Sequence, residues 1–406
     1  MTSMPHLVQK RPVIAADKNP EEGLSCCMHN SDRRYTGKAN SGDFIEAHRL
    51  LLACSTLSFK DELSLWGLQA IHSAYCFRGV VGQLDVVSVK LKKITPAVRK
   101  YCQQEKIPIS DWPVTVFPSQ FHLGVVVSFG HLIPESIIDA FPLGILNVHG
   151  SLLPRWRGAA PVIQAVMNND TETGITIMKI HPNRFDVGEI VSQSHIPIGW
   201  DTKSGQLTEG MAKLGAQELS NVLNDLKNKL NQEIKQDSKG VSKAPKVSEA
   251  TSQILWKKDD CRRIQAKYRA LDDHFPLWTT WLGKTVKLRN LVMKEELFQP
   301  KIKSTEVNIA IIDDLALKEE SAQQINAEQL VNKDIGNEQH QTNFQGQKII
   351  PGNIVYNKQR KVLSVYCKDG WVDFRMVIIK GKKPMTAGDF YNGFISKVDK
   401  ERQHFN

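Results

Sequence analysis

Long apolar runs are missing from this 406-residue chain. The richest apolar stretches, near residues 50–57 and 123–129, have only the length of a β-strand, whereas a helix that crosses a bilayer needs roughly 18 or more apolar residues. We therefore predict a chain without membrane-spanning helices and without a membrane partner.

Cysteine is scarce as well. The seven cysteines are few for the length and widely scattered, and no two of them are spaced as C-x-x-C. This excludes the dense disulfide framework of small secreted domains and gives no sign of a zinc site. We expect a protein of a reducing compartment that needs no metal.

Acidic residues are in short supply toward the C-terminus. Residues 241–406, leaving out the stretch 295–347, hold 24 lysines and arginines against 10 aspartates and glutamates, whereas residues 1–240 are nearly balanced, with 25 against 23. The omitted stretch is acidic, with 4 against 10. A positive field of this kind favours a polyanionic partner such as RNA, DNA or a membrane surface. A basic surface that serves only solubility is the alternative.

Sustained periodicity is absent from residues 1–47, which we interpret as a leader without regular structure. A mitochondrial presequence is rich in arginine and poor in acids. Here Asp17, Glu21 and Glu22 interrupt the few basic residues. The composition of this segment therefore does little to predict targeting.

Residues 48–228 alternate apolar, strand-like runs with amphipathic segments. Continuous apolar runs closed by glycine are typical of parallel strands covered on both faces. Leucine, methionine and valine recur at helical spacing over 207–226, which predicts a long helix at the end of the domain. The succession predicts an α/β domain with an open, mostly parallel, Rossmann-like sheet. The candidate strands are 122–130, 144–150, 174–180 and 189–196.

Residues 229–245 are dense in Lys, Gln, Ser and Asn, a composition typical of a linker. In the following segment, 246–406, one helix at 259–270 precedes short strands separated by turns, which predicts a small β-barrel of the oligonucleotide-binding (OB) type. The acidic, Gln/Asn-rich stretch 295–347 interrupts these strands and is interpreted as a surface insertion. The candidate strands are 281–291, 349–356, 361–367 and 371–379.

Polar residues follow an apolar strand at Asn147 and His149. Side chains two residues apart on a strand share a face, and the carboxyl ends of strands in open α/β sheets are where ligands bind. An amide beside an imidazole suits acyl transfer to an amine, because the amide can hold an oxyanion and the imidazole can relay a proton. Asp186 is the best candidate to orient His149. Taken alone, each residue also has a purely structural interpretation: His149 as a hydrogen-bonded core histidine, and Asp186 as a turn residue.

The run "NVHGSLLPRWRGAAPVIQAVMNNDTETGITIM", followed by "FDVGEI", resembles the methionyl-tRNA formyltransferases and, more widely, the enzymes that use 10-formyltetrahydrofolate. The resemblance extends from about Leu68 to the C-terminus, apart from the insertion. It implies that Asn147 holds the oxyanion, that His149 is oxyanion partner and proton acceptor, and that Asp186 orients His149. The folate site would be lined by Ser151, Leu152, Leu153 and Pro154. The reaction implied needs 10-formyltetrahydrofolate and no metal.

The C-terminal segments "SVYCKDGWV" and "MTAGDFYNGF" resemble the animal mitochondrial branch of that family, and "WRGAAP" resembles the enzymes that act on tRNA. The resemblance implies an initiator Met-tRNA partner, a role in translation initiation, a mitochondrial matrix location and, we expect, a monomer. Lysines and arginines that neutralise phosphates drive RNA binding. Four basic residues spaced over two turns of one helix are our leading RNA contacts, with a solvated helix face as the alternative. They are Arg262, Arg263, Lys267 and Arg269.

Two features depart from the family pattern. The opening strand of the family ends in a turn with glycine, but Phe59-Lys60-Asp61 stands here, and lysine does not adopt a left-handed turn as readily as glycine. We therefore expect a disturbed first strand. The basic loop that reaches the tRNA acceptor stem in relatives is represented only by Lys90, Lys92 and Lys93. Two other functions stay open: formyl transfer to a different acceptor, and RNA binding by a chain whose catalytic half is damaged.

Overall fold

The computed structural model describes residues 48–54, 61–78, 80–90, 95–298 and 349–406. These residues all belong to one compact unit, Glu46–Asn406. The leader assigned to 1–47 and nearly all of the insertion lie outside the described residues. No helix in the described ranges is long and apolar enough to span a membrane.

A seven-stranded sheet forms the first domain, in the order β3-β2-β1-β4-β5-β7-β8. The first five strands of this order are parallel, and β7 and β8 are each antiparallel to their predecessor. All five residues of β4 are buried, as its unbroken apolar run predicts. The open, mostly parallel sheet predicted from the sequence is confirmed. The strands are β1 His48–Cys54, β2 Val81–Ser88, β3 Ile109–Asp111, β4 Leu123–Val127, β5 Ile145–His149, β7 Glu172–Lys179 and β8 Ile190–Pro197.

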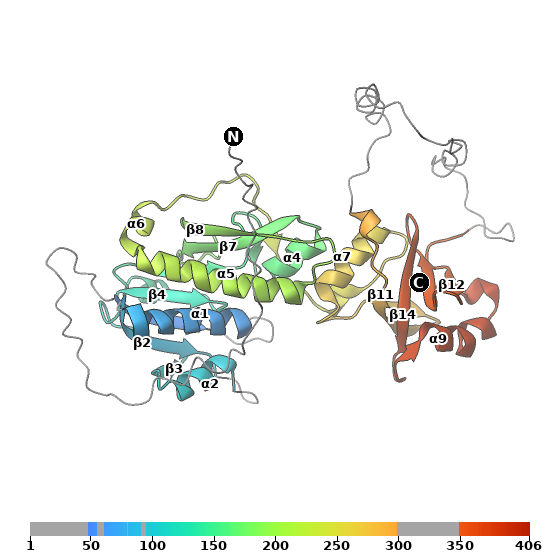
Figure 1. Ribbon diagram of the computed structural model, residues 1–406, viewed down its shortest axis with the longest axis horizontal. Coiled ribbons are helices and arrows are strands. Elements are labelled where there is room, and N and C mark those ends of the chain that lie inside the picture. The colour runs from blue at the N-terminus through green and yellow to red at the C-terminus, as the bar shows by residue number, and fades with distance from the viewer. Residues whose placement is uncertain (1–47, 55–60, 79, 91–94, 299–348) are drawn as a thin grey trace, which may run out of the picture. The chain divides into compact units, whose positions relative to one another are not determined.

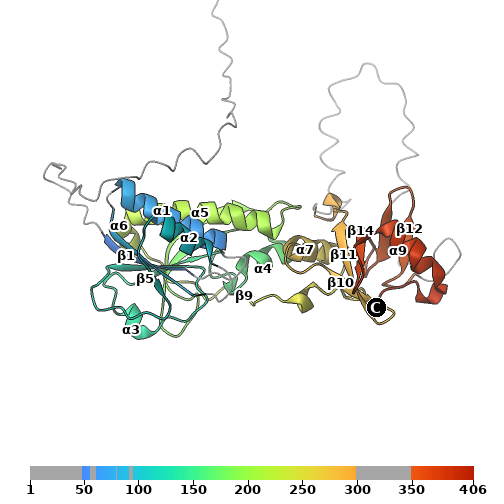
Figure 2. The same cartoon turned by 90° about the horizontal axis from the view of Figure 1, so that it is seen from below.

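Helices cover one face of this sheet, and connecting segments with one short helix cover the other. Helix α1 (Asp61–Ser73) packs against α5 (Ser204–Asn224) on one face, and α3 (Glu135–Ile138) lies beyond the other (Figures 1 and 2). Because side chains alternate along a strand, Leu50 joins the core under α1 whereas Leu51 joins the core of the opposite face. The remaining helices are α2 Ala97–Gln104, α4 Pro161–Met167, α6 Leu226–Asn231 and the π-helical turn Ala74–Arg78.

The first strand is intact, contrary to the expectation from the missing glycine. Strand β1 pairs in parallel with both β2 and β4, so it lies inside the sheet. Leu50 and Leu52 are fully buried, which explains why this segment holds its place: its apolar side chains fill the core whatever follows them. The turn at Phe59 and Lys60 lies outside the described residues, as do Lys92 and Lys93.

The segment expected to be a free linker, 229–245, is bound to the first domain along much of its length. Ile234 exchanges two backbone hydrogen bonds with Ile190, at 2.7 and 2.8 Å. Strand β9 (Lys243–Ala244) then pairs in parallel with β6 (Arg157–Gly158), in the loop after His149. A composition that suits a linker does not reveal these pairings, because they depend on partners far away in the sequence.

An antiparallel sheet forms the second domain, in the order β10-β11-β14-β13-β12, with β15 paired to β14. The small β domain predicted after residue 245 is present as an antiparallel sheet, and the expected strand 281–291 proves to be part of a hairpin that turns at Leu282 and Gly283. Helix α7 (Cys261–Leu271) matches the helix predicted at 259–270. The other elements are β10 Trp278–Trp281, β11 Lys284–Leu291, β12 Ile354–Asn357, β13 Val362–Tyr366, β14 Trp371–Ile379, β15 Met385–Thr386, α9 Ala387–Gly393 and the 3-10 turns Glu249–Ser252, Glu295–Leu297, Ile395–Lys397 and Lys400–Arg402.

Candidate active site

Asn147 and His149 lie on β5, and His149 is its last residue. Both side chains therefore share one face at the carboxyl end of a central strand, where open α/β sheets place their ligand sites. His149 is 5% exposed and Asn147 is half-buried. Within the described part of the chain, the side-chain amide of Asn147 has no hydrogen-bond partner, so its donors are available to a ligand.

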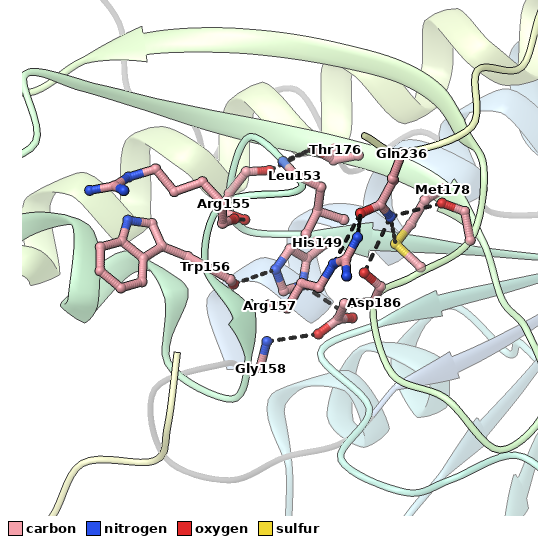
Figure 3. A network of polar contacts seen from close by, with 12 residues as sticks. His149, Leu153, Arg155, Trp156, Arg157, Gly158, Thr176, Met178, Asp186 and Gln236 are labelled. Atoms are coloured by element: carbon pink, nitrogen blue, oxygen red, sulfur yellow. Dashed lines mark hydrogen bonds and ion pairs between the residues drawn. The ribbon is translucent and has the colours of Figure 1, made fainter. Parts of the chain in front are cut away.

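The imidazole of His149 lies between two acceptors (Figure 3). Its Nδ1 faces Oδ1 of Asp186 at 3.5 Å, and its Nε2 lies 3.0 Å from the backbone carbonyl of Trp156. Because a carbonyl can only accept, Nε2 carries a proton when that bond is made. The two contacts fix the plane of the ring. The sequence prediction that Asp186 orients His149 thus has the geometry it needs.

Asp186 follows β7 in a left-handed backbone conformation, with φ +57°. Its second carboxylate oxygen accepts the backbone N–H of Gly158 at 2.9 Å. The carboxylate therefore connects His149 to the loop that contains Trp156 and Gly158. Held on both sides, it has little freedom to rotate away from the imidazole.

Thr176 of β7 anchors the loop that is predicted to line the folate site. The hydroxyl of Thr176 donates to the carbonyl of Ser151 at 2.6 Å and accepts the N–H of Leu153 at 3.0 Å. Ser151 and Leu153 are buried, whereas Leu152 and Pro154 are half-buried. Ser151 and Leu153 therefore fix the shape of the loop, whereas Leu152 and Pro154 leave part of their apolar surface exposed.

Asp170 fixes Trp156, the residue whose backbone carbonyl faces His149. It accepts two hydrogen bonds from Arg155, at 2.8 and 2.5 Å, and one from Nε1 of Trp156 at 2.7 Å. The Arg155 guanidinium also lies 4.4 Å from the centre of the Trp156 ring, and its hydrogen bonds to Asp170 raise the pKa of Arg155. Sequence reasoning missed Asp170, and the density of Pro, Arg and Gly after His149 was the only local signal.

A second missed residue is Gln236, from the segment after α6. Figure 3 shows its amide between Arg157 and the backbone at Asp186. It was hidden in a stretch whose composition is typical of a linker, so no sequence signal pointed to it.

One group in the described part of the chain brings three potential metal ligands together, and it lies outside this site. Cys261, Cys367 and Asp369 place their ligand atoms within 4.8 Å of one another. The two sulfur atoms are 3.3 Å apart, and the hydrogen bond to Cys367 together with burial raises the pKa of Cys261. None of the three lies in the sheet that carries His149.

Comparisons with known proteins agree with this geometry. A family model described as formyl transferase matches residues 115–223, which contain Asn147, His149 and Asp186, and one described as formyl transferase, C-terminal domain, matches residues 315–395. The chain is 38% identical over 339 residues to the mitochondrial methionyl-tRNA formyltransferase of Homo sapiens, covering 82% of this chain and 76% of the human protein. The chain belongs to the methionyl-tRNA formyltransferase family. The mouse enzyme, from Mus musculus, is 37% identical over 347 residues, which cover 85% of this chain and 79% of the mouse protein.

A solved structure supports the fold. The N-formyltransferase from Helicobacter canadensis, in complex with folinic acid and dTDP-3-aminofucose, matches with a TM-score of 0.51 at 14% identity, over 80% of this chain and 98% of that one. At this identity the likeness concerns the arrangement of strands and helices only.

The sequence predicts RNA contacts on α7. Arg262 is exposed, with its guanidinium 5.6 Å from the centre of the Phe298 ring. Arg263 is half-buried and donates to the carbonyl of Met167 in the first domain at 3.0 Å. Of these two, Arg262 is the one free to meet a phosphate.

The other two residues of α7 are buried, which corrects the expectation that all four contact RNA. Lys267 is 7% exposed and donates to Asp259 at 2.7 Å and to the carbonyl of Gln253 at 2.9 Å. Arg269 is 2% exposed and donates to Asn169 of the first domain at 2.6 Å, and burial lowers the pKa of Arg269 to about 10. These cations satisfy acceptors inside the protein, so the helix face they form is internal.

Exposed lysines gather instead at the turn after β14. Lys380, Lys382 and Lys383 are exposed there, and Lys284 is exposed at the start of the neighbouring β11. The N–H of Lys380 bonds the carbonyl of Thr285 at 2.9 Å, which brings Lys380 close to Lys284. None of the four lysines has an ion-pair partner among the described residues. Local spacing did not single them out, because strand pairing brings Lys284 to the others.

Proposed function

We propose that the protein transfers the formyl group of 10-formyltetrahydrofolate to the amino group of methionine carried by initiator tRNA, for translation initiation, and that it acts as a monomer in the mitochondrial matrix. The observation that carries the proposal is the placement of His149 between Asp186 and the Trp156 carbonyl, beside the amide of Asn147, which has no hydrogen-bond partner among the described residues. The relatives from human and mouse are named as mitochondrial methionyl-tRNA formyltransferases, which supports the acceptor and the compartment.

The chemistry follows from the donors at the end of β5. Asn147 donates its amide hydrogens to the formyl oxygen as that oxygen gains negative charge, which lowers the barrier because the donor is already in place. In the tautomer that carries its hydrogen on Nδ1, toward Asp186, His149 has an unprotonated Nε2, which takes the proton that the attacking amine loses and returns it to the departing folate nitrogen. Asp186 stabilises the imidazolium in between.

The substrates are assigned to two surfaces. Ser151, Leu152, Leu153 and Pro154 form the wall for the folate, with Ser151 and Leu153 fixing its shape and the half-buried side chains facing the ligand. The basic second domain binds the tRNA, with Arg262 and the four exposed lysines near the turn after β14 as contacts. Neutralisation of phosphates by these side chains supplies the affinity.

The decisive test measures formyl transfer by the purified full chain. With 10-formyltetrahydrofolate and charged initiator tRNA, we expect formyl-methionyl-tRNA, and His149→Ala and Asn147→Ala each to lower turnover by about 100-fold or more, the scale of losing a proton-transfer group or an oxyanion donor. His195→Ala is the matched control, because the His195 side chain is 62% exposed on β8.

Three outcomes would overturn the proposal or its acceptor. Product formation no faster than that of His149→Ala would remove the catalytic claim, and tRNA binding without saturable folate binding would assign the chain to RNA binding alone. Faster transfer to a free amine or to water than to Met-tRNA would favour a different acceptor.

A further inference from the structure

The segment 229–245 lies against the loop that follows His149 and bonds it at residues 156–158. We infer that Gln236 and Ser242 in this segment are positioning residues of the active site, and that the catalytic unit extends through Ala244 instead of ending near residue 228. The inference rests on the proposed function, since it assigns these residues to the same formyl-transfer site.

Gln236 bonds three residues from two segments of the site through one amide (Figure 3). Its oxygen accepts from Arg157, at 3.1 Å from Nε and 2.6 Å from Nη2. Its nitrogen donates to the carbonyl of Gly188 at 2.8 Å and to the carbonyl of Asp186 at 3.2 Å. The amide thus ties the loop after His149 to the segment that carries the Asp186 carboxylate.

Ser242 holds the other side of the same loop. Its hydroxyl accepts the N–H of Trp156 at 2.9 Å, and its carbonyl accepts the N–H of Arg157 at 2.9 Å. The carbonyl of Trp156, which faces His149, therefore belongs to a residue whose own N–H is bound by the linker segment.

Gly158 shows how closely this segment approaches. A Cβ at Gly158 would lie 2.6 Å from the carbonyl oxygen of Ala244, and its φ of +130° also favours glycine. The N–H of Gly158 bonds Asp186. Ala244 therefore lies directly against Gly158, the residue whose N–H holds the Asp186 carboxylate.

Left-handed backbone at Asp186 and Trp156, with φ of +57° and +62°, strengthens the argument. L-residues disfavour this conformation, so it persists only where surrounding contacts determine it. For both residues those contacts include the linker segment: Gln236 on the carbonyl of Asp186 and Ser242 on the N–H of Trp156. Without them, the two groups that face His149 lose part of their support.

Substitutions at Gln236 separate positioning from simple stability. Gln236→Glu keeps an acceptor for Arg157 but removes the donor to the two carbonyls, and Gln236→Met keeps the length without either function. Gln232→Met is the matched control, because Gln232 is an exposed glutamine four positions earlier. For Ser242, Ser242→Ala removes the hydroxyl, Ser242→Thr restores it, and the exposed Ser238→Ala is the control.

The experiment measures kcat and KM for Met-tRNA and for 10-formyltetrahydrofolate, together with urea unfolding, on the full chain. We expect Gln236→Glu and Gln236→Met to lower kcat by about 10- to 100-fold, the scale of displacing a catalytic group by a fraction of an ångström to one ångström, with both KM values within about twofold. We expect a smaller loss of kcat in Ser242→Ala, recovered in Ser242→Thr, and no change in the controls. Unchanged kcat at Gln236, or losses that merely follow the unfolded fraction, would overturn the inference.

A spectroscopic readout keeps the two claims distinguishable. In protein labelled with ¹⁵N-histidine, the ring signals of His149, assigned by their loss in His149→Gln, are expected to move in Gln236→Met and to stay in place in Gln232→Met. An inactive unsubstituted chain in which these signals still move would end the proposed function but retain the positioning role. Activity with unmoved signals would end the positioning role alone.

Discussion

Asp186 faces His149 with 3.5 Å between Oδ1 and Nδ1. Its other oxygen is occupied by the N–H of Gly158. The carboxylate therefore has two separable tasks, a charge directed at the imidazole and an acceptor for the backbone. A substitution that keeps the second task and removes the first isolates the electrostatic part of the site.

Asp186→Asn is that substitution. The amide oxygen can still accept from Gly158, whereas the side chain no longer stabilises a protonated His149, so we expect kcat for formyl transfer to fall by about 100-fold or more with stability nearly unchanged. Steady-state kinetics and urea unfolding test this. Asp139→Asn, at an exposed aspartate, is the control, and an Asp186→Asn enzyme with normal kcat would exclude a catalytic role for the charge.

How far the sequence predicted this site depends on the range of the contacts. Asn147 and His149 were found because both lie at the carboxyl end of one strand, a pattern visible within a few residues. Gln236 was not found, because its role arises from hydrogen bonds to residues about fifty and eighty positions away. The composition of a segment does not predict which distant residues it contacts in the fold.

The basic helix shows the opposite error. The spacing in α7 correctly predicted a helix and a cluster of positive charges. It could not show that Asp259 lies opposite Lys267 or that Asn169 lies opposite Arg269, so internal cations were interpreted as RNA contacts. Charge alone does not distinguish a surface that attracts phosphate from a buried group that is already paired.

Lys267 should therefore matter for stability more than for tRNA. Lys267→Met leaves the carboxylate of Asp259, itself buried, without its cation, and we expect a loss of about 3 to 5 kcal/mol in the free energy of unfolding, measured in urea through tryptophan fluorescence. The double variant Lys267→Met with Asp259→Asn should recover part of the loss, and Lys258→Met, at an exposed lysine, should cost little. A stable Lys267→Met protein with weakened tRNA binding would restore the original interpretation.

Lys382 and Lys383 should contribute to tRNA binding instead. Replacing both with alanine removes two exposed, unpaired charges, so we expect weaker binding and a salt dependence whose log–log slope falls by about 1 to 2. Binding of initiator tRNA at several salt concentrations measures this. Lys227→Ala with Lys235→Ala removes the same charge from exposed positions in the first domain. Equal effects of the two pairs would show that net charge matters and position does not.

Glu218 predicts how the stability of the first domain depends on pH. This residue of α5 is 9% exposed and accepts hydrogen bonds from Ser192 and Ser194 of β8. Burial alone would raise the pKa of Glu218, but these hydrogen bonds, with Asn221 and nearby Lys229, bring it below the ordinary value of 4.5. The folded state thus favours the carboxylate, and the stability this contributes is present above pH 4.5 and is lost as the pH falls through the lowered pKa.

Glu218→Gln makes this contribution measurable. At pH 7 we expect the variant to be less stable by about 1 to 3 kcal/mol, because two hydroxyls lose a charged acceptor, and the gap to the unsubstituted protein should narrow as the pH falls below 4.5. Urea unfolding at pH 7 and at several values below 4.5 provides the comparison. Glu172→Gln, whose side chain is 63% exposed, should show no such narrowing. A gap that stays constant with pH would mean that Glu218 stabilises the helix by packing and not by its charge.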